Sequence, residues 1–158
     1  MKSGSGFTLI EMLVVVAILA VLASAAFPLV QLNAQRDREH ELRLALRQIR
    51  TAIDEYKKAY DEGHMLKRTG ATGYPRNLDE LVKGVEDAST PNKKMLYFLR
   101  RIPRDPMFSG GPDTPAAETW GLRSYDSPPD EPRPGDDVYD VYALSAKTGL
   151  NGIPYREW

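Results

Sequence analysis

An uncharged run near the N-terminus constrains this chain more than any other feature. The nineteen residues from Met12 to Val30 carry no charged side chain, and the apolar character extends back to Phe7 with Glu11 as its only interruption. About twenty apolar helical residues cross the hydrocarbon core of a bilayer, because a helix rises about 1.5 Å per residue. The run is therefore a membrane helix or a helix that copies of itself cover.

Composition limits what the rest of the chain can be. Its 158 residues leave room for one compact domain after the run, and a mean hydropathy of −0.43 requires that domain to be polar outside. The net charge of −1 gives no reason to expect nucleic acid, and the lack of cysteine excludes disulfides and thiolate metal sites. The sequence contains no phosphate-binding loop, zinc-protease or nucleophile-elbow motif, so we do not expect an enzyme.

The first six residues, MKSGSG, decide between two interpretations of the run. The positive charge of Lys2 and the terminal amine keeps the N-terminus cytoplasmic and sends the rest across the membrane. In one interpretation the run is a secretory signal cut at Ala23-Ser24-Ala25, so that the mature chain begins at Ala26. In the other the cut follows Gly6 and the helix is retained. The intervening glutamate and the continuation of the run to Val30 favour retention.

The segment Gly6-Phe7-Thr8-Leu9-Ile10-Glu11 resembles the class III leader of type IV pilins and of type II secretion pseudopilins. The resemblance implies that a prepilin peptidase cleaves after Gly6 and methylates the new amine of Phe7. It identifies Glu11 with the glutamate at the fifth mature position of the family. Pro28 falls at the twenty-second mature position, where many family members have a helix-breaking proline.

Glu11 needs an explanation because a carboxylate near the centre of a bilayer costs about 2.5 to 3.5 kcal/mol. In the first helical turn the helix dipole offsets part of this cost. If a helix has an amine at its end and an acid one turn further, the acid of one copy can pair with the amine of a second copy shifted along the axis. The resemblance implies this role for Glu11 and for the amine of Phe7. The alternative is a glutamate that only favours the helix N-terminus. Pro28 frees the carbonyl of Ser24, which predicts a kink, or by resemblance a stretch that melts on packing.

A second helical segment follows the run. Residues 37–62 contain no glycine or proline, and six apolar residues recur at steps of three and four: Leu42, Leu46, Ile49, Ile53, Tyr56 and Tyr60. This stripe favours a domain packed on one helix face over a coiled coil. With the apolar run it predicts one helix of about fifty-five residues ending at Gly63. The divisions are 1–6 (leader), 7–31 (transmembrane or filament-core segment), 32–62 (amphipathic half) and 63–158 (head).

The sequence of the head, residues 63–158, predicts short helices and strands joined by loops. Asn77 predicts the start of a short helix over 78–82, and apolar residues predict a second over 92–99. Strands are expected over 120–125 and 138–145, with a third short strand, and the proline-rich residues 126–137 between them form an exposed loop. We therefore expect an α+β, pilin-like fold, in which the long helix packs against short helices and a small antiparallel sheet, with Trp158 against the head.

Two head motifs strengthen the resemblance. Tyr74-Pro75 followed by L-x-x-L-V, and R-I-P-x-D-P over 101–106, resemble the major (G-type) pseudopilin, although residues 107–119 form an inserted loop. Such pseudopilins commonly hold calcium, which makes Asp136, Asp137 and Asp140 weak candidate ligands. Lys147 follows the last strand and opposes a cation, so we expect no metal and no other cofactor.

The resemblance implies a structural subunit of a type II secretion pseudopilus. Its implied partners are copies of itself in a helical filament, a prepilin peptidase, an inner-membrane assembly platform with its ATPase, and minor pseudopilins. The implied location is the bacterial inner membrane, as a single pass with a cytoplasmic N-terminus and a periplasmic head, before extraction into the periplasmic filament. The alternatives are a major or minor type IV pilin, a minor pseudopilin at the filament tip, and a signal-anchored periplasmic binding domain.

Overall fold

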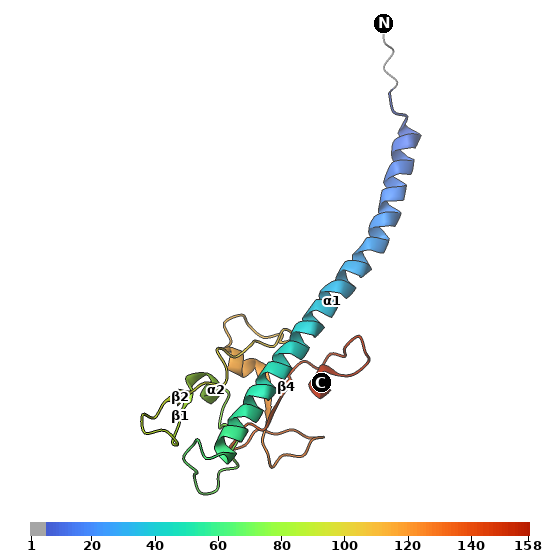
Figure 1. The fold of residues 1–158 in the computed structure, drawn as a ribbon. Coiled ribbons are helices and arrows are strands. Elements are labelled where there is room, and N and C mark those ends of the chain that lie inside the picture. Colours follow the sequence, from blue (N-terminus) through green and yellow to red (C-terminus); the bar gives the residue numbers. More distant parts are fainter. Residues whose placement is uncertain (1–5) are drawn as a thin grey trace. The chain divides into compact units, whose positions relative to one another are not determined.

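The computed structural model describes residues 6–158, apart from the side chains of residues 25–29. It confirms the predicted α+β, pilin-like fold, in which a long N-terminal helix precedes short helices and small antiparallel sheets (Figure 1). The elements are α1 (Leu9–Asp61), α2 (Asp79–Lys83), β1 (Val85–Glu86), β2 (Met95–Leu96), the 3₁₀ helix η1 (Ala116–Thr119), β3 (Trp120–Arg123), β4 (Asp140–Ala143) and the 3₁₀ helix η2 (Tyr155–Glu157).

The chain divides into two compact units, residues 1–37 and residues 38–158. The 53 residues of α1 contribute to both, because its N-terminal part lies in the first unit and its C-terminal part in the second. We refer to residues 38–158 as the head.

The predicted stripe on the C-terminal part of α1 forms the centre of the head's core. Leu42 and Ile49 are completely buried, and Ile53 is 1% exposed. Alanines on the same face are buried too, which lets other elements approach the helix closely. These elements supply the remaining buried apolar side chains, chiefly Leu78, Leu81, Leu99, Trp120, Val138 and Val141. The periodicity therefore identified the correct helix face.

Gly63 ends α1, as its position after the last periodic residue predicts. Its φ of +85° lies in the left-handed region, which glycine enters without a steric penalty. The Gly63 amide donates to the carbonyl of Tyr60 (3.1 Å), and the His64 amide donates to the carbonyl of Ala59 (3.0 Å). This pair of bonds is the Schellman arrangement, and it satisfies carbonyls that the helix end would otherwise leave open.

The first short helix forms where it is predicted, shifted by one residue to 79–83. The Asn77 side-chain carbonyl accepts a hydrogen bond from the Glu80 amide (3.1 Å), which is the capping role expected of it. The Glu80 carboxylate in turn accepts a hydrogen bond from the buried Tyr56 hydroxyl (3.1 Å), so α2 is bonded to α1 as well as packed against it.

The predicted helix over 92–99 is wrong. This region instead contains β2, which pairs antiparallel with β1 through Val85↔Leu96 and Glu86↔Met95. The intervening turn is held by Asp87, whose Oδ1 accepts bonds from the Ser89 amide (2.9 Å) and hydroxyl (2.6 Å). These bonds, together with a weaker contribution from His64, lower the pKa of the Asp87 carboxyl.

The apolar residues that suggested that helix have a different role. The amides of Phe98 and Leu99 both donate to the carbonyl of Leu81 (3.0 and 2.9 Å), which joins the segment after β2 to α2. Leu99 belongs to the buried core and Phe98 packs against it, so both contribute to the core without a helix.

Strands β3 and β4 form where they are predicted, each shorter than expected. They pair antiparallel from Trp120↔Ala143 to Arg123↔Asp140. Burial of Val141 and Ala143 assigns the core face of β4, which the sequence left open. Within the described residues no third strand joins this sheet, because the other two strands pair with each other.

The proline-pinned segment 101–106 is extended as predicted and is bonded to the start of β3. The Trp120 indole donates to the carbonyl of Pro103 (2.8 Å), and the Asp105 amide donates to the Thr119 hydroxyl (3.1 Å). The Asp105 carboxylate accepts from the Met107 amide (2.7 Å). Burial of this side chain raises the pKa of its carboxyl, an effect that the hydrogen bond opposes.

The C-terminal residues pack against the head, as expected of Trp158. Its ring lies edge-on to the ring of Tyr155 and beneath the Arg43 guanidinium, 4.3 Å from the ring centroid. The buried Glu39 carboxylate accepts bonds from the Tyr155 hydroxyl (2.9 Å) and from the Leu150 amide (2.8 Å). Buried polar contacts thus hold the C-terminal segment on α1.

Two glycines with positive φ allow a matched test of the fold. In Gly84→Ala the new Cβ would lie 2.7 Å from the backbone oxygen of Leu96, whereas in Gly63→Ala it would meet nothing within 4 Å. We expect Gly63→Ala to lower the free energy of unfolding by about 1 kcal/mol and Gly84→Ala by about 2 to 3 kcal/mol. Urea unfolding monitored by circular dichroism measures both, and equal losses would contradict the tight β2 contact.

Tyr56 predicts an alkaline limit to stability. Burial, and secondarily the negative charge of Glu80, raises the pKa of Tyr56 from its ordinary value of 10.0 to about 12. The neutral phenol is the stabilising form, so its contribution is complete below pH 10 and is lost as the pH rises towards 12. Tyr56→Phe removes the hydrogen bond to Glu80, so it should lower the free energy of unfolding at pH 7 by about 1 kcal/mol.

The same variant supplies the control for that titration. Between pH 10 and 12 the unfolding free energy of the wild-type chain should fall more steeply than that of Tyr56→Phe. Parallel pH profiles for the two chains would contradict the assignment.

Candidate functional site

Thr8 fixes the start of α1. The Glu11 amide donates to the Thr8 hydroxyl (3.3 Å), and the Met12 amide donates to the Thr8 carbonyl (3.2 Å). Thr8 is therefore the N-cap, and Glu11 lies three residues later, at the spacing of a capping box. The T-x-x-E pattern in the sequence is the signal that predicts this N-cap.

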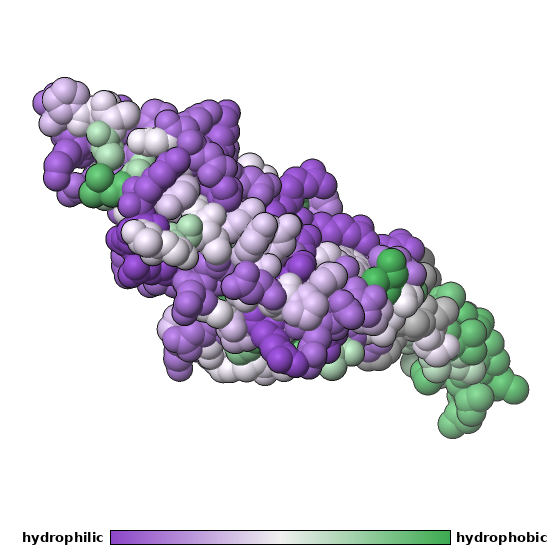
Figure 2. Space-filling model, turned by 90° about the horizontal axis from the view of Figure 1, so that it is seen from below, coloured by the Kyte–Doolittle hydropathy of each residue, from purple (hydrophilic) through white to green (hydrophobic). Residues whose placement is uncertain are grey.

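The helical surface after this cap is apolar and uncovered. Phe7 is 77% exposed and Leu9 84%, although side chains of this type are usually buried. Figure 2 shows such residues as a dense hydrophobic region. A continuous exposed surface of this kind marks a site of contact with another molecule. The exposed large side chains are Phe7, Leu9, Ile10, Met12, Leu13, Val14, Val15, Val16, Ile18, Leu19, Val21 and Leu22.

The predicted site residues lie along this surface. Gly6 and Phe7 precede the first turn of α1, which contains Glu11, so the predicted cleavage position and the acid lie at the same end of the helix. Pro28 lies within the bounds of α1, but its side chain is outside the described residues. The Ser24 hydroxyl donates to the carbonyl of Val21 (2.7 Å).

Among the residues that the structure describes, no helix combines the length and apolar character needed to cross a membrane.

The chemistry that this site offers is association. Glu11 is an exposed acid on an otherwise apolar helix surface. Cleavage after Gly6 would add an amine one turn before it. An acid and an amine offset along a helix suit a second copy displaced along the axis, because each charge then meets its opposite in an environment of low dielectric constant, where attraction is strong.

Two of the three carboxylates considered for calcium have other partners. Asp137 is buried, and its carboxylate accepts hydrogen bonds from the Thr72 hydroxyl and from the Tyr125 amide (2.8 Å). Asp140 forms an ion pair with Arg50 (2.7 Å), and Asp136 is exposed in the loop. Within the described part of the chain, no three histidine or acidic side chains are grouped as metal ligands would be.

Arg50 is a structural residue that the sequence analysis missed, because it lies off the apolar stripe. Its guanidinium donates to the Asp140 carboxylate, to the carbonyl of Val141 (3.1 Å) and to the carbonyl of Trp158 (2.7 Å). A single side chain of α1 thus bonds both β4 and the C-terminal residue. No local pattern in the sequence indicates these contacts, because the partners lie 90 to 108 positions along the chain from Arg50.

Comparison with known families agrees with the geometry of the N-terminus. Residues 1–27 match a family model described as the prokaryotic N-terminal methylation motif. The match includes Gly6, Phe7 and Glu11, although residues 1–5 lie outside the described structure. It supports a type IV pilin-like protein with a prepilin-type leader, which implies a prepilin peptidase and assembly into a pilin-like filament. Comparisons with curated proteins and with solved structures give no match.

The Arg50 contacts give a prediction about the head. Arg50→Ala should lower the free energy of unfolding by about 1 to 2 kcal/mol, because the group is partly exposed and charged hydrogen bonds are then worth less than in a core. Arg47→Ala, three residues earlier on an exposed face of α1, should change it by less than about 0.5 kcal/mol. Thermal unfolding of both variants decides the point, and a neutral Arg50→Ala would remove the role assigned to this side chain.

Proposed function

We propose that this protein is a structural subunit of a type II secretion pseudopilus. Prepilin peptidase cleaves the chain after Gly6 and methylates Phe7, and the N-terminal part of α1 then polymerises with copies of itself to support protein export. The protein has no catalytic role in this proposal, and neither calcium nor another cofactor is required for it.

The observation that carries the proposal is the exposed apolar surface of α1 with Glu11 in its first turn. A surface of this extent needs a cover, and copies of the same helix supply one. Apolar burial stabilises such packing by about 25 cal/mol per Å². In the first turn, Glu11 costs less to bury than it would in mid-helix, and pairing with the amine of Phe7 offsets the remainder.

Before assembly, we propose that the N-terminal segment resides in the bacterial inner membrane with its start in the cytoplasm and the head in the periplasm. The support is the prepilin-type leader and the uncharged sequence from Met12 to Val30. An assembly platform with its ATPase would extract the subunit, and minor pseudopilins would complete the filament. The same leader also occurs in type IV pilins. The lack of cysteine favours the pseudopilin, because many pilins close a C-terminal loop with a disulfide.

Two variants of Glu11 separate assembly from helix capping. Glutamine at the third helical position still completes a capping box, whereas alanine does not, and neither carries a charge. In cells that supply a prepilin peptidase and a secretion platform, we expect both Glu11→Gln and Glu11→Ala to be processed normally and to reduce filament yield at least about tenfold, the effect of losing about 1.4 kcal/mol per contact. Microscopy of sheared filaments and a secretion assay provide the readouts.

Mass spectrometry of the mature chain completes this test. A methylated N-terminal Phe7 supports the proposal, and a chain that begins at Ala26 overturns it. Normal filaments from Glu11→Gln would show that the acid only caps the helix. Filaments without any effect on secretion would instead favour a type IV pilus.

A further inference from the structure

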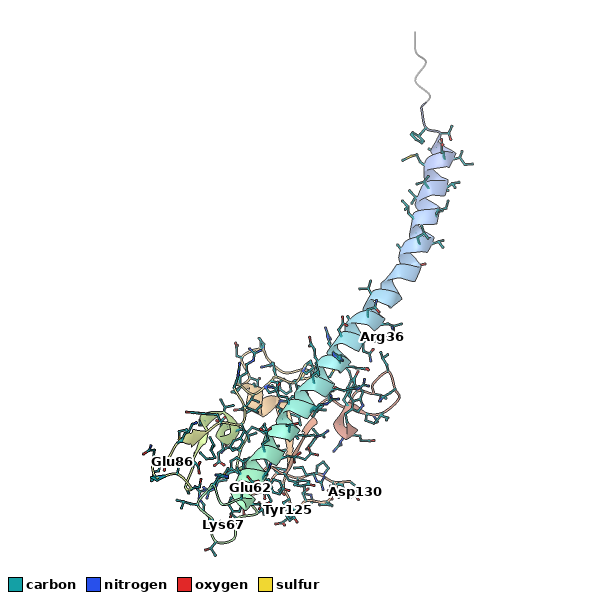
Figure 3. All side chains as sticks on the ribbon, in the orientation of Figure 1. Arg36, Glu62, Lys67, Glu86, Tyr125 and Asp130 are labelled. Atoms are coloured by element: carbon teal, nitrogen blue, oxygen red, sulfur yellow. The ribbon has the colours of Figure 1, made fainter. Side chains whose placement is uncertain are left out.

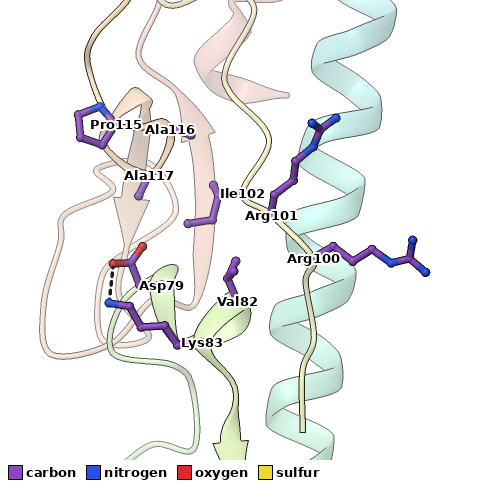
Figure 4. Close-up of a pocket in the computed structure, with 9 residues that line it drawn as sticks. All are labelled: Asp79, Val82, Lys83, Arg100, Arg101, Ile102, Pro115, Ala116 and Ala117. Atoms are coloured by element: carbon purple, nitrogen blue, oxygen red, sulfur yellow. Dashed lines mark hydrogen bonds and ion pairs between the residues drawn. The ribbon is translucent and has the colours of Figure 1, made fainter. Parts of the chain in front are cut away.

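A shallow groove lies on the head beside α2. It has a volume of about 290 Å³, and Val82, Ile102 and Ala117 give it an apolar floor. Figure 4 shows the Asp79–Lys83 ion pair (3.1 Å) on one side and two adjacent arginines, Arg100 and Arg101, on the other, with their guanidinium groups extending away from the apolar floor. The groove therefore has apolar walls, and the two arginines form a basic rim on the surface outside it.

The two arginines at this rim are free to bind something else. Both are exposed, and within the described part of the chain neither forms a hydrogen bond or ion pair. Arg104, three residues later, contrasts with them, because its guanidinium donates to the carbonyls of residues 111, 112 and 114. Next to Arg100 a second hollow is lined by Tyr97, which is 65% exposed, and Phe98. Aromatic and apolar surface thus continues from the groove.

The loop over 126–137 has the complementary chemistry. Its exposed acids Asp126, Asp130 and Asp136 have no ion-pair partner among the described residues, and Glu131 pairs only with the neighbouring Arg133 (2.6 Å). The loop also carries Pro128, Pro129, Pro132 and Pro134, most of them exposed. Proline-rich segments are stiff and dock into aromatic-lined grooves, because little conformational entropy is lost on binding.

This loop is held in shape at its base. The Ser127 hydroxyl accepts a bond from the Arg133 amide (2.8 Å), and the Ser127 carbonyl accepts two bonds from the Arg123 guanidinium (3.2 Å each). The Ser124 amide donates to the carbonyl of Arg133 (2.9 Å), which closes the loop. A preorganised loop binds more tightly than a flexible one of the same composition.

We propose that the acidic, proline-rich loop 126–137 of one subunit docks into the Arg100–Arg101 groove of a second copy of this chain. The loop does not line the groove of its own head, and the labels of Asp130 and Glu86 in Figure 3 place the loop and the α2–β1 region on different sides. Two different patches that bind each other form a head-to-tail contact, and such a contact generates a filament when its rotation does not close a ring. The inference rests on the proposed function and specifies how neighbouring heads contact one another.

The sequence contains no cysteine, so a cross-linker that reacts with thiols will join only cysteines introduced by substitution. Lys83→Cys marks the groove and Pro129→Cys marks the loop, and filaments carrying both are treated with a short bis-maleimide. A head-to-tail contact predicts a ladder of multimers from the doubly substituted chain, but only dimers from a mixture of the two single variants. The control pair, Lys83→Cys with the exposed Lys147→Cys, should give no ladder.

Charge reversal tests the recognition itself. Arg100→Glu with Arg101→Glu should reduce the ladder about tenfold, and adding Asp130→Lys with Asp126→Lys should restore it to within about twofold of the starting level. Lys67→Glu with Arg68→Glu makes the same change in charge at another exposed basic pair and should leave the ladder unchanged.

The outcomes separate the two proposals. Filaments that form without a ladder, or a reversal that the loop substitutions do not rescue, overturn the contact and leave the proposed function standing. Dimers from Lys83→Cys alone would indicate a symmetric contact and also overturn it. If the wild-type chain forms no filaments, the proposed function fails and the inference fails with it.

Discussion

Burial of one face of α1 is the interaction on which the head depends. Leu42, Ile49 and Ile53 are almost completely removed from solvent, and each side chain of this kind contributes about 1.5 to 3 kcal/mol on burial. The short elements have little stability of their own, because a five-residue helix and strands of two to four residues cannot form alone in water. Several of them persist because they contribute side chains to the core around this helix face, as Leu81 of α2 and Val141 of β4 do. Specific bonds, such as that from Tyr56 to Glu80, then fix their positions.

The N-terminal part of α1 presents the opposite situation. It has the same backbone as the part within the head, but its large apolar side chains, from Phe7 to Leu22, lack any cover within the described chain. Contacts within one molecule therefore bury the apolar residues of the head. The apolar residues of the N-terminal unit need another molecule to cover them. A capped first turn with Thr8 and Glu11 fits this division, since the cap fixes where the helix starts before any partner is present.

Sequence reasoning predicted the features that follow from local pattern. The stripe from Leu42 to Tyr60, the stop at Gly63, the cap at Asn77 and the strand after Trp120 all have such signals. It failed at β2, because Met95 is followed by apolar residues three and four positions later, Phe98 and Leu99, which is helical spacing. The competing signal is the turn held by Asp87, and that turn depends on bonds to Ser89 and Lys94 that form only when the chain folds back. The hydrogen bonds of Arg50 join it to Asp140 and Trp158, which lie 90 and 108 positions later in the chain, so no local sequence pattern indicates them. The motif around Gly6 could be identified from the sequence because its residues follow one another without a gap.

The way loop 126–137 is anchored has a consequence for how this protein can diverge. Its closing bonds use Ser127, Arg133 and the buried Asp137, so the residues between them contribute little to the core. Substitutions at the tip can accumulate with small effects on folding, while they alter the chemistry that the head displays. Related chains could thus acquire different neighbours through a few changes in one short segment, with the supporting architecture left intact.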